Sequence, residues 1–278
     1  MLRLLSIEIQ KIKLNKAAKV ITAVYFLLII AIALIASIEF NFAQVNFRIA
    51  DQGFFNFPFI WHFNTYVAGI LKLFLAIIIV SMMSNEYSYR TLKQNLIDGM
   101  SKKEFITSKF LTVLMFAAIS TVFVFLVSLI LGFFFSDHTE LAVVFRDMEY
   151  LLAYFIKLVG FFSFCLFLGI FVKRSAFALG FLVIWQIIEG IIYGVLKWQL
   201  FKGTEIAEKI INFFPLESMA DLIKEPVTRL GGVQTLANQV GEEFNKDYNV
   251  QWYTILIVLI WTTIFIYGSY AILKRRDL

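Results

Sequence analysis

The 278-residue chain is poor in charge and has a single cysteine. Charged residues make up 16% of it, against about a quarter of a typical soluble domain, while 60% of its residues are hydrophobic. The lone cysteine, Cys165, lies inside an apolar run, which excludes an intramolecular disulfide and a cysteine metal cluster. With a mean hydropathy of +0.80, the composition is that of an integral membrane protein.

Several chemical motifs are also missing from the sequence. There is no G-x-x-x-x-G-K-[ST] phosphate loop, so the chain has no recognisable means of hydrolysing a nucleotide. His62 and His138 stand alone, and no metal site is expected. No removable signal peptide is evident before the first apolar run. We therefore predict that the chain is not an enzyme, binds no cofactor of its own and has no nucleic-acid partner.

What the sequence has in abundance is long apolar stretches. Each is near the ~20 residues that a membrane-spanning helix needs, and none alternates as a barrel strand would. They are Val20–Ile38, Asn64–Met83, Phe110–Phe135, Leu151–Val172, Ala176–Leu196 and Tyr253–Leu273. We predict an all-α integral membrane protein with six transmembrane helices, which forms a single domain over residues 1–278.

Lysine and arginine predict the orientation of these helices. Fifteen of them lie in the N-terminus, the second and fourth connections and the tail, against eight in the other connections. Cytoplasmic loops carry the excess of positive charge. Both termini and the connection at residues 85–109 are therefore predicted to be cytoplasmic, in a multi-pass protein of the inner, cytoplasmic membrane of a bacterium.

Two further regions lie outside the predicted spans. Residues 1–19 have an apolar stripe flanked by lysine and arginine, which predicts a helix lying in the membrane interface. Residues 197–252 have apolar residues at helical spacing and are expected to form short helices on the outer side. The first outer connection, residues 40–63, is crowded with aromatic residues. We expect it to anchor in the outer leaflet, with a gate for an apolar substrate as the alternative.

The segment at residues 85–109 is the most polar stretch between two apolar runs. Tyr89, Leu92, Leu96 and Met100 fall close to one helical face, and Gly99 can end that helix. Directly after it, the S-x-x-E pattern of residues 101–104 matches a capping box that starts a second helix. Such a shape could dock onto a soluble partner and pass movement into the membrane. The alternative is a helix resting on lipid headgroups.

Three ionisable residues, Lys72, Lys157 and Glu189, fall inside the apolar runs. Charges in lipid are costly and normally face a partner or a water-filled cavity. Lys157 and Glu189 are expected at similar depth on neighbouring helices, so we predict an ion pair between them, with a structural role favoured over transport. Lys72 has no obvious partner. Gly190 and Gly194 form a G-x-x-x-G motif, which is a candidate subunit interface.

Taken over essentially the whole chain, this plan resembles the permeases of the ABC-2 type, the transmembrane subunits of a class of ABC transporters. The most specific residues are Glu86-Tyr87-Ser88-Tyr89-Arg90-Thr91-Leu92, Gly99-Met100-Ser101-Lys102-Lys103-Glu104 and Lys109. Arg90 replaces the glycine that is common before Thr91, and Gly99-Met100 stands where proline is frequent.

The resemblance implies a dimer of permease subunits, as a homodimer or with a related paralogue, driven by separate cytosolic ATPase subunits that bind ATP and magnesium. Such systems mostly export. Residues 1–19 would be the elbow helix and the helix at Tyr89–Met100 the coupling helix, seated in the ATPase. The residues implied in coupling are Glu86, Tyr89, Arg90, Thr91, Leu92, Leu96 and Met100.

Other functions remain open at this stage. A scaffold or immunity-type membrane protein could use the same helix to dock a cytosolic partner without transport. An intramembrane metalloprotease needs carboxylates and histidines at membrane depth, whereas the adjacent pair Glu242-Glu243 lies in the last outer connection without histidine partners. An ion-driven carrier predicts internal repeats, and none is clear. The sequence does not identify a substrate.

Overall fold

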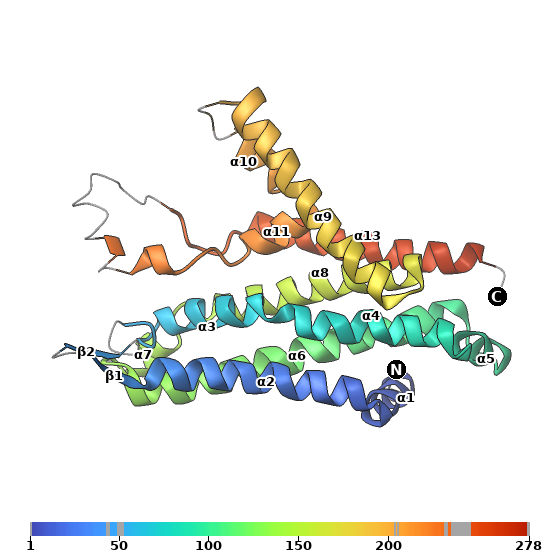
Figure 1. The fold of residues 1–278 in the computed structure, drawn as a ribbon, viewed down its shortest axis with the longest axis horizontal. Coiled ribbons are helices and arrows are strands. Elements are labelled where there is room, and N and C mark those ends of the chain that lie inside the picture. Colours follow the sequence, from blue (N-terminus) through green and yellow to red (C-terminus); the bar gives the residue numbers. More distant parts are fainter. Residues whose placement is uncertain are drawn as a thin grey trace.

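The computed structural model describes residues 2–42, 45–48, 53–202, 204, 206–230, 233–234 and 246–276. Its long helices run side by side in an elongated bundle (Figure 1). Both ends of the described chain lie at one end of this bundle, together with a short helix, α5 (Thr91–Ile97). We call this end of the bundle the terminal end. A small β-hairpin lies at the opposite end, which we call the hairpin end.

The elements are α1 (Leu2–Leu14), α2 (Lys16–Ser37), β1 (Glu39–Phe42), β2 (Val45–Arg48), α3 (Phe59–Ile70), α4 (Lys72–Ser88), α5, α6 (Lys102–Phe135), α7 (Leu141–Val144), α8 (Glu149–Val172), α9 (Ser175–Val195), η2 (Leu196–Leu200), α10 (Ile206–Ile211), α11 (Pro215–Asp221), η3 (Val227–Arg229) and α13 (Trp252–Arg275). β1 and β2 pair antiparallel, from Glu39 opposite Arg48 to Phe42 opposite Val45. Apart from this hairpin, the described elements are helical.

The apolar runs of the sequence form the long helices. Five helical stretches are long and apolar enough to cross a membrane: α2, α6, residues 141–172 with α8, residues 175–200 with α9, and α13. α3 and α4 pass the same test only together, as a pair bent by 44° at a break at Leu71. The structure therefore has five candidate spans, or six if this bent pair is one span, and hydropathy alone did not reveal the break.

α8 is the central helix of the bundle and the most buried of the candidate spans. It packs against α3, α4, α6, α9 and α13. Small residues allow the close approach: a side-chain carbon added at Gly160 would lie 2.7 Å from Val258 of α13. A cluster of three hydroxyl groups joins three helices inside this core. Tyr25 of α2, Ser120 of α6 and Tyr154 of α8 are hydrogen-bonded to one another at 2.6–2.8 Å. Each of these three buried hydroxyls thus has a partner.

Three aromatic residues of the first outer connection lie inside the bundle. Phe55, Phe57 and Trp61 are buried, and their rings pack against phenylalanines of α6. The Trp61 indole also donates to the carbonyl of Val144 at 2.8 Å. The expected membrane anchor is therefore wrong for these three rings, which fasten α3 to α6 and α7 instead. The side chains at residues 40–50 lie outside the described part.

The last outer connection forms the short helices that the sequence predicts, in α10, α11 and η3. Residues 203, 205, 231–232 and 235–245 of it lie outside the described part. α11 does not rest on the outside of the bundle but packs against α8, α9 and α13. Trp261 of α13 donates to the carbonyl of Phe213, just before α11, at 2.8 Å. This connection therefore folds back onto the spans.

Candidate functional site

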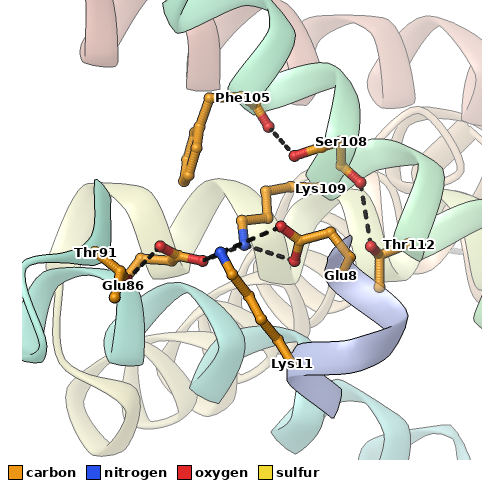
Figure 2. A network of polar contacts seen from close by, with 8 residues as sticks. All are labelled: Glu8, Lys11, Glu86, Thr91, Phe105, Ser108, Lys109 and Thr112. Carbon is orange, nitrogen blue, oxygen red and sulfur yellow. Dashed lines mark hydrogen bonds and ion pairs between the residues drawn. The ribbon is translucent and has the colours of Figure 1, made fainter. Parts of the chain in front are cut away.

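Four helices meet around buried charges at the terminal end of the bundle (Figure 2). Glu8 and Lys11 come from α1, Glu86 from the last turns of α4, and Lys109 from the second turn of α6. Thr91, the first residue of α5, completes the group, which we call the ionic cluster. It brings together residues separated by up to 101 positions in the sequence.

Glu86 is the centre of the ionic cluster. Its Oε1 atom accepts from Lys109 Nζ at 2.5 Å and from Lys11 Nζ at 2.7 Å, and its Oε2 atom accepts from the Thr91 hydroxyl at 2.5 Å. Only 3% of the Glu86 side chain is exposed. One carboxylate therefore joins α1, the start of α5 and α6 to the end of α4.

The remaining contacts make the cluster electrically neutral. Lys109 Nζ lies 2.7 Å from Glu8 Oε2, and this lysine is fully buried. Two carboxylates thus face two ammonium groups, since Lys11 lies 3.6 Å from Glu8. Burial lowers the pKa of Lys11, but its bonds to Glu86 and Glu8 outweigh this and raise the pKa above its ordinary value. Buried charges need such compensation, because an unpaired one is costly.

The turns on either side of α5 follow from local sequence. Arg90 has a left-handed backbone with φ of 56°, which ends α4 and turns the chain into α5. Gly99, with φ of 96°, follows the end of α5, as predicted. The capping box is confirmed: the Ser101 hydroxyl accepts from the Glu104 amide at 3.1 Å, and the Glu104 carboxylate accepts from the Ser101 amide at 2.8 Å.

The predicted apolar face of the coupling segment is divided in the structure. Leu92 is buried, and Leu96 and Met100 pack against the core. Tyr89 and Ile97 instead are exposed, at 75% and 74%. The single-face prediction is wrong, because the left-handed Arg90 takes Tyr89 out of the helical periodicity. The exposed surface, which we call the outer face of α5, consists of Tyr89, Arg90, Lys93, Gln94 and Ile97.

A family model of the ABC-2 family transporter proteins matches residues 3–278. The chain belongs to this family. No curated protein matches the chain. Family membership and the apolar helices together establish a multi-pass membrane protein that is a permease component of an ABC transporter. Permeases of the ABC-2 family generally pair with a cytosolic ATPase subunit.

The ABC-2 permease does not form the predicted ion pair between Lys157 and Glu189. Glu189 accepts from the Trp185 indole at 2.6 Å and from the amides of Leu216 and Glu217 at 3.2 and 2.9 Å. Lys157 Nζ donates to the Ala220 carbonyl at 3.3 Å. The pair is replaced because α11 lies between its partners. The amino end of α11 binds the carboxylate of Glu189, and its carboxyl end binds the ammonium group of Lys157, as the helix dipole favours.

Two other predicted features of the permease lie apart from the ionic cluster. The ammonium group of Lys72 stands over the ring of Phe161, 4.4 Å from its centre, and has no described hydrogen-bond partner. Gly190 and Gly194 lie on α9, where a side-chain carbon added at either would meet nothing within 4 Å. The G-x-x-x-G motif therefore packs against nothing in the described part of this chain.

Sequence reasoning found only part of the ionic cluster. Glu86 and Thr91 belong to the residues that the resemblance implies in coupling, and Lys109 belongs to the motif that carries the resemblance. Glu8 and Lys11 were missed, because in α1 they read as members of a basic amphipathic surface. The available signal was a glutamate three residues before a lysine in that helix, together with an unexplained lysine at residue 109.

Proposed function

We propose that the chain is the transmembrane permease subunit of an ATP-driven exporter in a bacterial cytoplasmic membrane. Two copies, or this chain and a paralogue, form the pathway, and two cytosolic ATPase subunits supply ATP and magnesium binding. α1 serves as the elbow helix and α5 as the coupling helix, with the terminal end in the cytoplasm. The observation that carries the proposal is the ionic cluster, which joins α1, α4 and α6 by buried ion pairs and bonds the start of α5 to Glu86 through Thr91.

The cluster explains how movement of α5 reaches the membrane. Sliding α1 relative to α4 and α6 would separate charges that have little contact with water, and sliding α5 would break the bond between Thr91 and Glu86. Breaking one partner out of a buried ion pair costs about 3–5 kcal/mol. The four helices therefore move as one body when the ATPases close on ATP, and the spans α4 and α6 tilt with α5.

The outer face of α5 is the contact surface for the ATPase in this proposal. Tyr89 and Ile97 are large exposed side chains at the terminal end, and the exposed Lys93 stands between them in the sequence. Aromatic and aliphatic anchors that fill a pocket typically dominate such interfaces. Leu92 and Leu96 hold α5 to its own chain and are not available to a partner.

The second permease subunit is proposed to contact α9. This helix has Ile191 exposed at 61%, beside the open Gly190 and Gly194. Small residues four apart allow helix backbones to approach closely in lipid. A cysteine at residue 191 would test this contact by disulfide formation between subunits, because the native Cys165 is buried and does not compete.

The first test is a pull-down of the tagged protein from its native membrane in a mild detergent, followed by mass spectrometry and an ATPase assay. Ile97→Asp, on the outer face of α5, is expected to abolish recovery of an ATPase. The matched control is Leu141→Asp, which places the same charge on an exposed leucine in α7, near the hairpin end.

Loss of the ATPase in Ile97→Asp but not in Leu141→Asp supports the coupling role. If folded wild-type protein recovers no ATPase, the permease proposal fails and the scaffold that docks another cytosolic partner takes its place. If both variants still bind an ATPase, the contact lies elsewhere than the outer face of α5.

A further inference from the structure

A cavity lies at the bend between α3 and α4, apart from the ionic cluster. Its volume is about 340 Å³, and residues of α3, α4, α8, α9 and α11 line it. Cavities of roughly 300–1,000 Å³ are the usual size for small-molecule sites. The lining includes the two intramembrane lysines, Lys72 and Lys157, together with Gln186.

The two lysines give this cavity a positive charge that no carboxylate of its lining balances. Lys157 is 5% exposed, and its one described hydrogen bond goes to the Ala220 carbonyl. Lys72 contacts the face of Phe161. None of the residues that line the cavity is a carboxylate. Glu217 and Asp221 of α11 attract Lys157 only from outside the lining.

Two of the three nearby carboxylates, Glu189 and Asp221, are already engaged, and the third, Glu217, lies outside the lining. Glu189 is bound by the amino end of α11 and by Trp185. Asp221 lies 3.8 Å from Lys224 and accepts from Thr254 at 3.5 Å. Because Lys72 and Lys157 line the same cavity, two ammonium groups there repel each other. Like charges in a surrounding of low dielectric constant are costly, and an anion placed between them would relieve both.

The remaining walls of the cavity are apolar and open to one side. Leu182 and Leu216 are buried, whereas Val183 and Ile187 of α9 are exposed at 56% and 55%. Both exposed residues belong to α9, which leaves the bundle at an angle (Figure 1). A ligand that fills this space would thus place a charged group at the lysines and an apolar part along α9.

We propose that this cavity binds an anionic amphiphile, with a carboxylate or phosphate at Lys72 and Lys157 and an alkyl chain along α9. Binding requires only this chain; the further statement that such molecules are the transported cargo rests on the proposed function. Charge-assisted bonds to two ammonium groups supply recognition of the head, and burial of the chain against α9 supplies the remaining affinity.

The test uses the full-length chain in a neutral maltoside detergent and a twelve-carbon fatty acid that carries a photoreactive diazirine at its far end. Labelled peptides are identified by mass spectrometry. Label is expected on α9, and the uncharged alcohol of the same length is expected to label at least about tenfold less, since one lost charged contact is worth a factor of this order.

The double variant Lys72→Met, Lys157→Met is expected to lose labelling by about tenfold or more. Lys157→Arg keeps the charge and is expected to retain labelling. The matched control is Lys197→Met, which removes a lysine that pairs with Glu208 beyond the end of α9 and does not line the cavity. Size-exclusion profiles establish whether each variant is folded. If the double methionine variant is not folded, the double variant Lys72→Gln, Lys157→Gln is used in its place.

Three results would overturn the proposal: equal labelling by the acid and the alcohol, labelling that survives loss of both lysines, or displacement of the probe by millimolar inorganic phosphate. The last result would mean that the cavity takes a free anion and not an amphiphile. Failure of labelling in a protein that still recovers its ATPase would leave the permease proposal intact, so the two can fail separately.

Discussion

Buried lysines occur in two regions of this permease, and their surroundings are opposite. In the ionic cluster, Lys109 is fully buried and contacts two carboxylates, at 2.5 and 2.7 Å. At the cavity, Lys157 is almost as buried but contacts one backbone carbonyl at 3.3 Å. The first arrangement holds four helices together. The second leaves positive charge available to a ligand. Burial of a charge therefore indicates function only when its partners are known.

The largest effect on stability is expected from replacing Lys109 in the ionic cluster. Lys109→Met removes the cation shared by Glu8 and Glu86, and leaves two buried carboxylates with only Lys11. We expect it to lower the free energy of unfolding by about 3–5 kcal/mol. Thermal unfolding of the purified protein measures this. Lys103→Met, at an exposed position of the same helix, is the control and should change little.

A loss below about 1 kcal/mol in Lys109→Met would contradict the rigid-body role of the ionic cluster. The partner variant Glu86→Gln refines the result. If Glu86 and Lys109 act as one pair, the double variant should be less destabilised than the sum of the two single variants.

Glu189 is a third buried ionisable residue. It has no ion pair in the described part of the chain, unlike Lys109, but it has more hydrogen bonds than Lys157, from two backbone amides and an indole. Glu189→Leu leaves these donors without an acceptor and should cost about 1–3 kcal/mol. Release of α11 should also increase proteolysis after α9. Glu208→Gln, at an exposed carboxylate, is the control. Unchanged stability and proteolysis would mean that Glu189 does not hold α11 in place.

Lys157→Met is expected to act in the opposite direction from Lys109→Met. Removing a buried charge that has no ion pair, in exchange for an apolar side chain of similar length, should leave stability unchanged or raise it by about 1 kcal/mol. Chemical or thermal unfolding compares the two variants directly. Destabilisation by Lys157→Met equal to that by Lys109→Met would remove the distinction between the two regions.

The smallest effect is expected at the partly exposed edge of the ionic cluster. Lys11 bonds the same Glu86 oxygen as Lys109, but 35% of its side chain is exposed. Lys11→Met should therefore cost about 1 kcal/mol or less, because water screens the pair. The folded-state pKa of Lys11 is raised, so its contribution is full below the unfolded pKa and is lost as the pH rises through the folded one. If Lys11 no longer contributed to stability at neutral pH, the raised pKa would be contradicted.

Local patterns predicted the parts of the fold that local forces determine. The apolar runs became helices, and Gly99 and the capping box at Ser101 and Glu104 lie where the sequence predicts. The apolar face of the coupling helix was wrong because Arg90 takes a left-handed backbone, which helical periodicity does not register. The predicted ion pair between Lys157 and Glu189 was wrong because both side chains hydrogen-bond to the backbone of a later segment, α11.

By itself, the sequence determined that this chain is a polytopic helical membrane protein with a polar segment between its second and third spans. Hydropathy and capping act over neighbouring residues, so they can be read from the sequence. The tertiary structure decided which charges are paired. Glu8 and Lys109 are 101 residues apart, and only the packing of α1 against α6 brings them together, whereas the same packing process leaves Lys72 and Lys157 beside a cavity.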